Sequence, residues 1–232
     1  MVVEDPEVPE DMATFFDIRA DGYDDVIRNY VFEGVADSFY EALCEPIERT
    51  DKPLQILDLG CGTGLEIAYL LQRVPNAVIT GVDLSTGMLE HLQGSYIAHM
   101  GQITLITDSY LTMPLGTQAY NHVISALANH HLLRDAKRQL YTRIHAALKP
   151  GGKYIEGDSV TRADSEGEFL ADFQQEAAKV PPATDGYYHI DIPFSIETQR
   201  SLLLEAGFRD FELLWQLDSS AVWNIAVYAV TA

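Results

Sequence analysis

The sequence predicts an α/β protein with a doubly wound, seven-stranded sheet that is mostly parallel and carries helices on both faces. Two observations carry this prediction. Short apolar runs alternate with helical patterns through the middle of the chain, which is typical of right-handed crossovers and a parallel sheet. The last two strand-like runs, 208–217 and 222–231, are joined by a link of only a few residues. Strands with so short a link pair antiparallel, so the sheet should end in a C-terminal hairpin.

Each parallel strand is expected where a short apolar run ends in turn residues. These strands are Leu54–Leu59, Ala77–Val82, Ile103–Thr107, His122–Ala126 and Lys153–Gly157. The helices expected between them are Leu65–Arg73, Thr86–Met100 with Ser85 as its N-cap, and Leu133–Leu148. The last of these stops at residues 149–152, which read Lys-Pro-Gly-Gly.

The two ends of the chain carry further helical patterns. Helical periodicity from Met12 to about Thr50 predicts two or three helices before the first strand. We interpret residues 1–53 as an N-terminal helical cap on a main domain, 54–232. After the fifth strand we expect an insertion at about 163–193, with a helix over 166–179 and a loop over 180–193. Ser195 then caps a helix over 196–206.

Composition excludes several classes of protein. The length of 232 residues fits one domain with an elaboration. The formal net charge of −20 argues against binding nucleic acid or anionic membrane surfaces. No apolar run approaches the length of a membrane span, and the first residues lack the pattern of a secretory signal. Cys44 and Cys61 are expected as reduced thiols, so the protein is expected in the cytoplasm.

A glycine-rich turn follows the first predicted strand, where residues 56–64 read Ile-Leu-Asp-Leu-Gly-Cys-Gly-Thr-Gly. Glycine lets the main chain approach a ligand closely and adopt conformations that other residues disfavour. Such a turn, between a strand and a helix, lies where open α/β sheets bind nucleotides. Taken alone it has a second interpretation, because turns of this kind also use glycine for packing.

Acidic residues are expected at the same edge of the sheet as this turn. Asp83 ends the second strand about 20 residues beyond the turn, where an acid accepts hydrogen bonds from ribose hydroxyls. Its alternative role is helix capping, for which Ser85 is better placed. Asp108 ends the third strand and could accept from an adenine amine or serve only as a turn acid. Asp58 could organise the glycine turn or receive an ammonium group.

These motifs resemble those of the class I S-adenosylmethionine-dependent methyltransferases of the small-molecule type. Residues 57–64 are similar to the first motif of that family, and Asp83, Asp108, 123–126 and 148–153 follow in the family's order. The resemblance covers about residues 54–158. It implies a Rossmann-like domain, methyl transfer from S-adenosyl-L-methionine to a small molecule, and S-adenosyl-L-homocysteine as product. The family often has an acid just before the fourth strand, where this chain has Asn-His, so we assign no role there.

The resemblance also implies which residues bind the cofactor. Asp83 would hold the ribose, Leu84 and Met88 would flank the adenine, and the glycines would lie against the methionine end. The expected cofactor-binding residues are Arg19, Tyr23, Asp58, Gly60, Cys61, Gly62, Gly64, Asp83, Leu84, Met88, Asp108, Ser109 and Ala126.

The candidates for catalytic work are His130, His131 and His189. His130 and His131 follow the fourth strand, where they could contact the acceptor as hydrogen-bonding groups or bases, or simply pack and cap the next helix. His189 lies in an aromatic loop that could cover the pocket or form part of the surface. A hydroxyl acceptor would need a base, whereas an acceptor with a neutral lone pair would not.

Other site chemistries are disfavoured. No metal site is expected, because consecutive histidines on a turn cannot easily face one ion and no Cys or His cluster completes a ligand set. The fingerprint of nicotinamide-dependent oxidoreductases places its third glycine one residue later than Gly64. A non-catalytic or cofactor-modifying S-adenosylmethionine-binding protein is the main alternative. The sequence leaves open the acceptor, the methylated element and the oligomeric state, a homodimer included.

Overall fold

The computed structural model describes residues 8–181 and 187–232, so residues 182–186 of the predicted loop lie outside the described residues. The strands form one sheet of eight strands in the order β3-β2-β1-β4-β5-β8-β7, with β6 paired to β5. Strands β1 to β5 pair parallel, whereas β8 pairs antiparallel with both β5 and β7. The mostly parallel sheet with an antiparallel C-terminal hairpin is therefore confirmed. The strands are β1 Gln55–Leu59, β2 Val78–Asp83, β3 Ile103–Thr107, β4 Tyr120–Ala126, β5 Leu148–Thr161, β6 Phe194–Ser195, β7 Arg209–Gln216 and β8 Trp223–Thr231.

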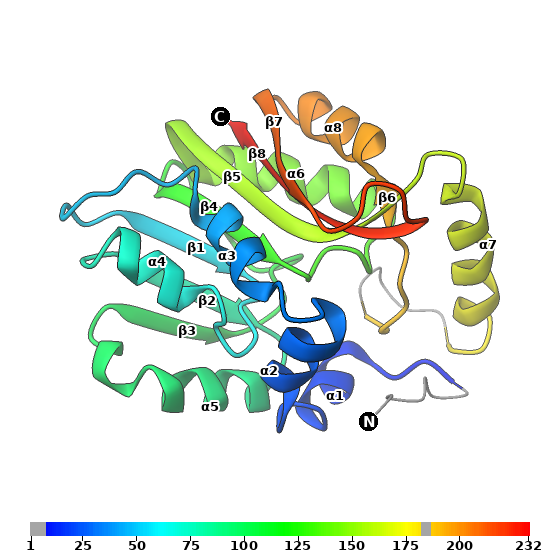
Figure 1. The fold of residues 1–232 in the computed structure, drawn as a ribbon, viewed down its shortest axis with the longest axis horizontal. Helices are drawn as coiled ribbons and strands as arrows, with labels where there is room; N and C mark the ends of the chain where they lie inside the picture. The colour runs from blue at the N-terminus through cyan, green and yellow to red at the C-terminus, as the bar shows by residue number, and fades with distance from the viewer. Residues whose placement is uncertain (1–7, 182–186) are drawn as a thin grey trace.

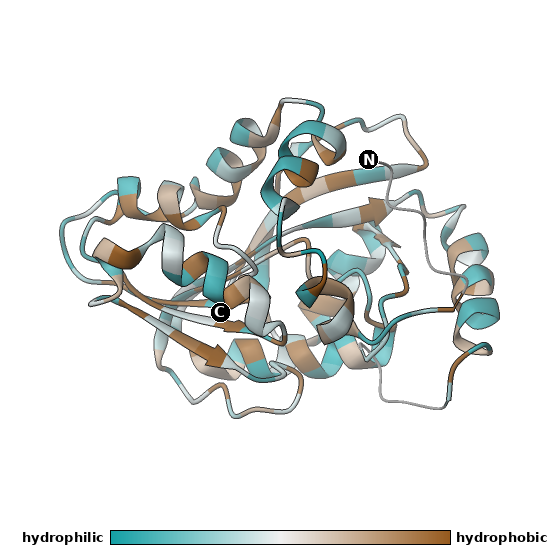
Figure 2. Ribbon diagram, turned by 90° about the horizontal axis from the view of Figure 1, so that it is seen from below, coloured by the Kyte–Doolittle hydropathy of each residue, from teal (hydrophilic) through white to brown (hydrophobic). Residues whose placement is uncertain are grey.

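Helices cover both faces of this sheet (Figure 1). One face packs against α3, α4 and α5, and the other against α6 and α8. Figure 2 shows hydrophobic residues along the strands between these layers. The helices are α1 Met12–Asp17, α2 Tyr23–Val26, the π-helical turn η1 Ile27–Val31, α3 Ala36–Cys44, α4 Ile67–Arg73, α5 Thr86–Ser95, the 3₁₀ turn η2 Ile97–His99, α6 Arg134–Ala147, α7 Glu166–Ala177 and α8 Ile196–Glu205.

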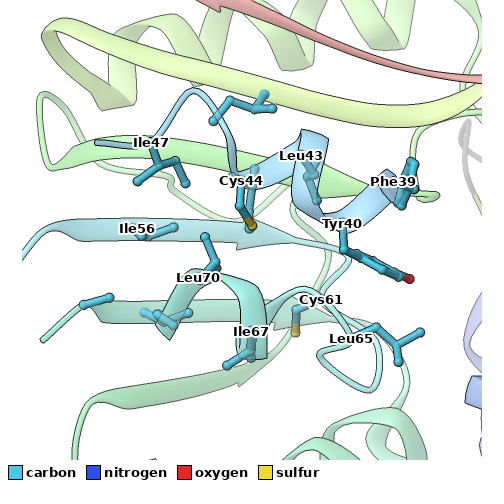
Figure 3. Close-up of a cluster of buried hydrophobic side chains, with 14 of the residues drawn as sticks. Phe39, Tyr40, Leu43, Cys44, Ile47, Ile56, Cys61, Leu65, Ile67 and Leu70 are labelled. Carbon is cyan, nitrogen blue, oxygen red and sulfur yellow. The ribbon is translucent and has the colours of Figure 1, made fainter. Parts of the chain in front are cut away.

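The alternation of side chains along β1 explains the two layers. Ile56 points into the cluster beneath α3 and α4, whereas Leu57 and Leu59 point into the cluster beneath α6 and α8. Figure 3 shows the first cluster, with Cys44 on α3 and Cys61 in the turn after β1. Both cysteines are free, as expected of reduced thiols, and both are buried.

Capping side chains begin two of the helices as predicted. The hydroxyl of Ser85 accepts a hydrogen bond from the amide of Met88 at 3.0 Å, and that of Ser195 accepts from Thr198 at 3.2 Å. These bonds satisfy amides that have no partner within the first turn of a helix.

Two elements differ from the sequence-based expectation. Strand β5 extends to Thr161, because β8 pairs with it from Lys153 to Thr161, and this extension also lets the two-residue β6 add to the sheet. Helix α5 stops at Ser95 instead of Met100 and is followed by η2. Gly94 and Ser95 are poor helix formers, which accounts for the earlier end.

The carboxyl ends of the parallel strands meet a group of short segments at one edge of the molecule. Figure 1 places α1 and α2 at this edge, next to α5, with α7 farther out. In the described part of the chain, no helix combines the length and the apolar character that crossing a membrane requires.

Helix α3 should depend on a glycine in β5 for its packing. A Cβ atom on Gly157 would lie 2.6 Å from the ring of Phe39, which is fully buried. Gly157→Ala should therefore lower the free energy of unfolding by about 1–3 kcal/mol, as overpacked cores do. Chemical denaturation measures this change. Gly167→Ala is the control, because no atom lies within 4 Å of its added methyl group; an equal loss in both variants would contradict the packing argument.

Candidate functional site

The glycine turn after β1 combines close packing with exposed backbone. Gly60 and Gly64 have φ angles of 71° and 77°. A Cβ atom on Gly60 would lie 2.5 Å from that of Ala128, and one on Gly64 would lie 2.9 Å from the Ile67 side chain. A Cβ atom on Gly62 would meet no atom within 4 Å. Packing therefore accounts for Gly60 and Gly64, whereas Gly62 has the open space that close approach of a ligand would require.

Asp83 ties this turn to the next strand and helix. Its Oδ2 accepts a hydrogen bond from the Gly62 amide at 2.8 Å, and its Oδ1 accepts from the Ser85 amide at 2.9 Å. Burial raises the pKa of Asp83, although these backbone donors act in the opposite direction. A carboxylate has about four acceptor positions, so two bonds leave others for a ligand.

A cavity opens between the glycine turn, the ends of β2 to β4 and the N-terminal helices. The space between atoms there, its mouth included, is about 650 Å³. Most of its wall is apolar. It is lined by Met12, Phe16, Tyr23, Gly60, Gly62, Asp83, Leu84, Met88, Ser109, Tyr110, Leu111, Ala126, Leu127, Ala128, His131 and Leu132.

The structure brings most of the expected site residues to this cavity, but not all of them. Those on its wall are Tyr23, Gly60, Gly62, Asp83, Leu84, Met88, Ser109, Ala126 and His131. Those not on its wall are Arg19, Asp58, Cys61, Gly64, Asp108, His130 and His189. Sequence reasoning missed Met12, Phe16, Tyr110, Leu111, Leu127, Ala128 and Leu132, because an apolar side chain carries no local signal that separates a pocket wall from a core.

Two of the expected residues away from the wall have other partners. The Arg19 guanidinium donates to Glu10 at 2.8 Å and to the Phe15 carbonyl at 2.9 Å, outside the cavity. Asp108 is exposed, and its carboxylate accepts from the Ser109 amide at 2.7 Å. Asp108 therefore stands at the rim, with Ser109 on the wall.

Asp58 lies beneath the glycine turn beside a second acid, Glu66. Both are buried, and both carboxylate oxygens of Asp58 and one of Glu66 have no hydrogen-bond partner. Burial raises the pKa of Glu66 to about 7. It raises the pKa of Asp58 well above its usual range, with the nearby Glu66 charge adding to the effect. The pair is thus protonated more readily than ordinary carboxyl groups.

Hydrogen bonds to acidic side chains hold the N-terminal helices against the site. The Asp17 carboxylate accepts from the Ser85 hydroxyl at 2.6 Å and from the Gly87 amide at 2.9 Å, which joins α1 to the start of α5. The Thr63 hydroxyl donates to Asp24 at 2.5 Å, which joins the glycine turn to α2. Phe16 and Tyr23 thereby reach the cavity wall.

The histidines of the sequence analysis form one cluster with two acids that the sequence did not single out. Nδ1 of His130 lies 2.6 Å from Asp158, a buried residue of β5. Nδ1 of His131 lies 3.1 Å from Asp191, and Nε2 of His130 lies 3.5 Å from the same carboxylate. The longer β5 is what carries Asp158 to this position, which explains why the shorter predicted strand did not reveal it.

The imidazoles of this cluster differ in charge. Although burial lowers the pKa of His130, the Asp158 carboxylate more than offsets this and raises it. Burial, together with the neighbouring His130, lowers the pKa of His131. Burial also lowers the pKa of His189 to about 3. His130 is therefore the imidazole that most readily carries a positive charge.

His189 is held away from the cavity. Its ring stacks on that of Phe15 with the centroids 3.5 Å apart, and it lies 4.5 Å from the ring of His131. Its segment is bound to the N-terminal part of the chain, since the His189 amide donates to the Glu10 carbonyl at 2.9 Å. The segment around His189 therefore backs the histidine cluster.

Consecutive histidines on a turn are not expected to face one ion easily. In the described residues, one nitrogen each of His130 and His131 and an oxygen of Asp191 lie within 4.8 Å of one another. Hydrogen bonds within the cluster account for this proximity, because the imidazole nitrogens face Asp158, Asp191 and the Ile190 carbonyl. The expectation of no metal stays a prediction.

Comparisons with known proteins place the chain among methyl-transferring enzymes. Residues 56–152 match the family model described as a methyltransferase domain. The methyltransferase YdaC of Bacillus subtilis, itself uncharacterized, is 31% identical over 139 residues, which are 60% of this chain and 74% of YdaC. The O-methyltransferase rstn1 of Aspergillus nomiae is 26% identical over 171 residues, 72% of this chain and 70% of that protein.

The fold has solved counterparts. The phosphoethanolamine N-methyltransferase 2 of Haemonchus contortus, in complex with S-adenosyl-L-methionine, has a TM-score of 0.69 at 16% identity. The match covers 95% of this chain and 58% of that protein. At this identity it shows a shared fold alone. Two further bacterial relatives are aligned over 66% of their own length, so the chain spans about two thirds of such curated relatives.

Glu66 should make stability depend on pH. Its folded pKa, about 7, lies above the ordinary value of 4.5, so the contribution to stability is complete below about pH 4.5 and is lost as the pH rises to about 7. Glu66→Gln should flatten this decline by an amount on the order of 1–3 kcal/mol. Denaturation between pH 5 and pH 8 measures it. Glu41→Gln, which replaces an exposed acid, should follow the wild-type curve; parallel curves for all three proteins would rule out the effect.

Proposed function

This chain belongs to the class I S-adenosylmethionine-dependent methyltransferases, and we propose that it transfers a methyl group from S-adenosyl-L-methionine to a small-molecule acceptor. The observation that carries the proposal is Asp83, partly buried at the end of β2 and bonded to the Gly62 amide beside a largely apolar cavity. A cavity of this kind suits a small acceptor better than a polymer. The O-methyltransferase name of one relative points the same way.

The residues present fit this cofactor. Asp83 keeps acceptor positions for ribose hydroxyls beyond its two backbone bonds. Leu84 and Met88 would enclose the adenine from the start of α5, and the open face of Gly62 leaves room for the methionine end. Ser109 and the exposed Asp108 would stand at the adenine rim. The bound cofactor supplies a methyl group already activated by a positively charged sulfur, so the protein mainly positions the acceptor and excludes water.

The charges around the cavity favour a cationic cofactor. No lysine or arginine is among the described residues of its wall. Asp83 lies on the wall, and Asp24 is bonded to the hydroxyl of Thr63 in the adjoining turn. Such a site attracts the sulfonium form more strongly than the neutral product. This difference would assist release of S-adenosyl-L-homocysteine after the transfer.

The N-terminal helices complete the enclosure. They supply a part of the cavity wall that the sheet edge alone does not provide, through Met12 and Phe16 of α1 and Tyr23 of α2. Asp17, through its bonds to Ser85 and Gly87, holds α1 against the helix that would flank the adenine. We propose that cofactor binding and acceptor binding both depend on this contact, because it closes the same cavity.

The function is tested in two steps. Calorimetry should detect binding of S-adenosyl-L-methionine and S-adenosyl-L-homocysteine to the folded protein, and a product assay should detect S-adenosyl-L-homocysteine release over a panel of small metabolites. Absence of binding by both compounds would remove the basis of the proposal. Binding without release for any acceptor would favour a non-catalytic S-adenosylmethionine-binding protein.

Asp83→Asn should weaken binding of S-adenosyl-L-methionine by about 1–3 kcal/mol, roughly 5-fold to 150-fold in Kd, because an amide replaces a charged acceptor of hydroxyl hydrogen bonds. Calorimetry measures the change, and a thermal melt confirms that the variant is folded. Asp210→Asn, which neutralises an exposed acid on β7, is the matched control. Equal affinities for wild type and Asp83→Asn would exclude the ribose role.

A further inference from the structure

His131 forms part of the cavity wall and has one ring nitrogen without a hydrogen-bond partner. The residue is only 3% exposed, its Nε2 has no hydrogen-bond partner, and it forms part of the cavity wall. A buried polar atom left unpaired destabilises the folded protein. Since Phe16, Leu132 and their neighbours on the wall are apolar, a ligand in the cavity is the natural partner for this nitrogen.

The surroundings of His131 fix which of its nitrogens carries the proton. Nδ1 lies 3.1 Å from an Asp191 carboxylate oxygen and 3.3 Å from the Ile190 carbonyl oxygen. Both groups only accept hydrogen bonds, so Nδ1 is the donor and carries the hydrogen. In a neutral imidazole the other nitrogen, Nε2, then holds the lone pair. His131 therefore brings a proton acceptor to the wall of the cavity.

Asp191 is itself held in place by the neighbouring imidazole. Nε2 of His130 lies 3.5 Å from Asp191 Oδ1, while Nδ1 of His130 is bound by Asp158 at 2.6 Å. Asp158 in turn accepts from the Asn129 amide at 2.9 Å. A series of contacts thus runs from Asp158 through His130 and Asp191 to His131. It keeps the positive charge on His130 and leaves His131 neutral on the cavity wall.

The cavity restricts the class of acceptor that such a base can serve. With no lysine or arginine among the described residues of the wall, an anionic acceptor has no partner there. A protonated amine would have to share an apolar space with the sulfonium cation, which is unfavourable. A neutral hydroxyl group needs no cationic partner and does not repel the sulfonium. The oxyanion that it forms is attracted to the sulfonium.

The acidity of the hydroxyl narrows the class further. A phenol has a pKa of about 10, within a few units of that of imidazole. Efficient proton transfer requires such a match, and alcohols are far less acidic. The apolar wall also suits an aromatic ring.

We propose that His131 is the general base of an O-methyltransferase whose acceptor is a neutral, largely apolar molecule bearing a phenolic hydroxyl. This inference rests on the proposed methyl transfer. In the reaction the hydroxyl proton passes to His131 Nε2, the oxygen forms a bond to the methyl carbon, and the bond from that carbon to sulfur breaks with its electron pair left on sulfur. The half-exposed Asp191 carboxylate, 53% accessible, lies between the resulting imidazolium and solvent.

The other two histidines position this base. His130 holds Asp191 and is turned toward Asp158, and His189 packs on His131 from the side of Phe15. Neither lines the cavity. Both therefore act through His131 and not on the acceptor.

A series of phenols of graded acidity tests the base. Wild type and His131→Gln are assayed with para-methoxyphenol, phenol and para-nitrophenol, by S-adenosyl-L-homocysteine release and by mass of the methyl ether. His131→Gln should lower kcat by about 10²–10⁴-fold for the least acidic phenol, and by much less for para-nitrophenol, which ionises largely without help. Affinity for S-adenosyl-L-methionine should be unchanged, and His99→Gln, at an exposed site, should match wild type.

The outcomes separate a base from a structural residue. An equal loss for every phenol would make His131 structural and overturn the proposal. Transfer to amines or carboxylates but to no phenol would overturn it while leaving the proposed methyl transfer intact, whereas failure to bind the cofactor would overturn both. Loss of activity when a metal chelator is added would indicate that the histidine cluster binds an ion, and it would also overturn the proposal.

A measurement without turnover supports the same distinction. Nitrogen-15 NMR of the imidazoles should show His131 as the neutral form with its hydrogen on Nδ1. Asp191→Asn should disturb that preference and lower kcat for phenol, with para-nitrophenol again affected least. A His131 that carries its hydrogen on Nε2 in the wild-type protein would overturn the assignment.

Discussion

The carboxylate of Asp83 is the contact on which the site depends. Its two oxygens receive the amides of Gly62 and Ser85, so one side chain fixes the glycine turn after β1 relative to the start of α5. Parallel pairing of β1 with β2 brings these segments together, with Asp58 beside Gly81 and Leu59 beside Val82. The cavity floor is thus set by sheet register, and its acid is held by donors that do not need a ligand to be in place.

Charge is distributed unevenly around that floor, and this division gives the site its chemistry. Asp83 lies on the wall beside the glycine turn, whereas Asp58 and Glu66 lie beneath the turn and, with raised pKa values, hold protons more readily. Another part of the wall carries His131, which is paired with Asp191, and His130 with its partner Asp158 lies behind it. A cationic cofactor is therefore favoured on one side and proton acceptance on the other, which agrees with the proposed roles of the two sides.

Much of the architecture followed from local signals. The alternation of apolar runs with helical patterns predicted the parallel part of the sheet, and Ser85 and Ser195 marked helix starts that the structure confirms. The spacing of the glycines and of Asp83 predicted where a nucleotide-like ligand would lie, because strand ends meet at one edge of a parallel sheet. Element ends were less certain: the full length of β5 depends on its pairing with β8, which no local pattern reveals.

The sequence by itself determined the fold class, the glycine turn and the acid beside it, because these depend on periodicity and on fixed spacing along the chain. Tertiary structure alone decided which histidine faces the cavity. His130 and His131 are adjacent in sequence and chemically identical, yet one is bound to Asp158 and the other lies on the cavity wall with Nε2 unpaired. That difference arises from residues about 30 and 60 positions away, Asp158 and Asp191, and contacts at such separation are set by how the sheet and its loops pack.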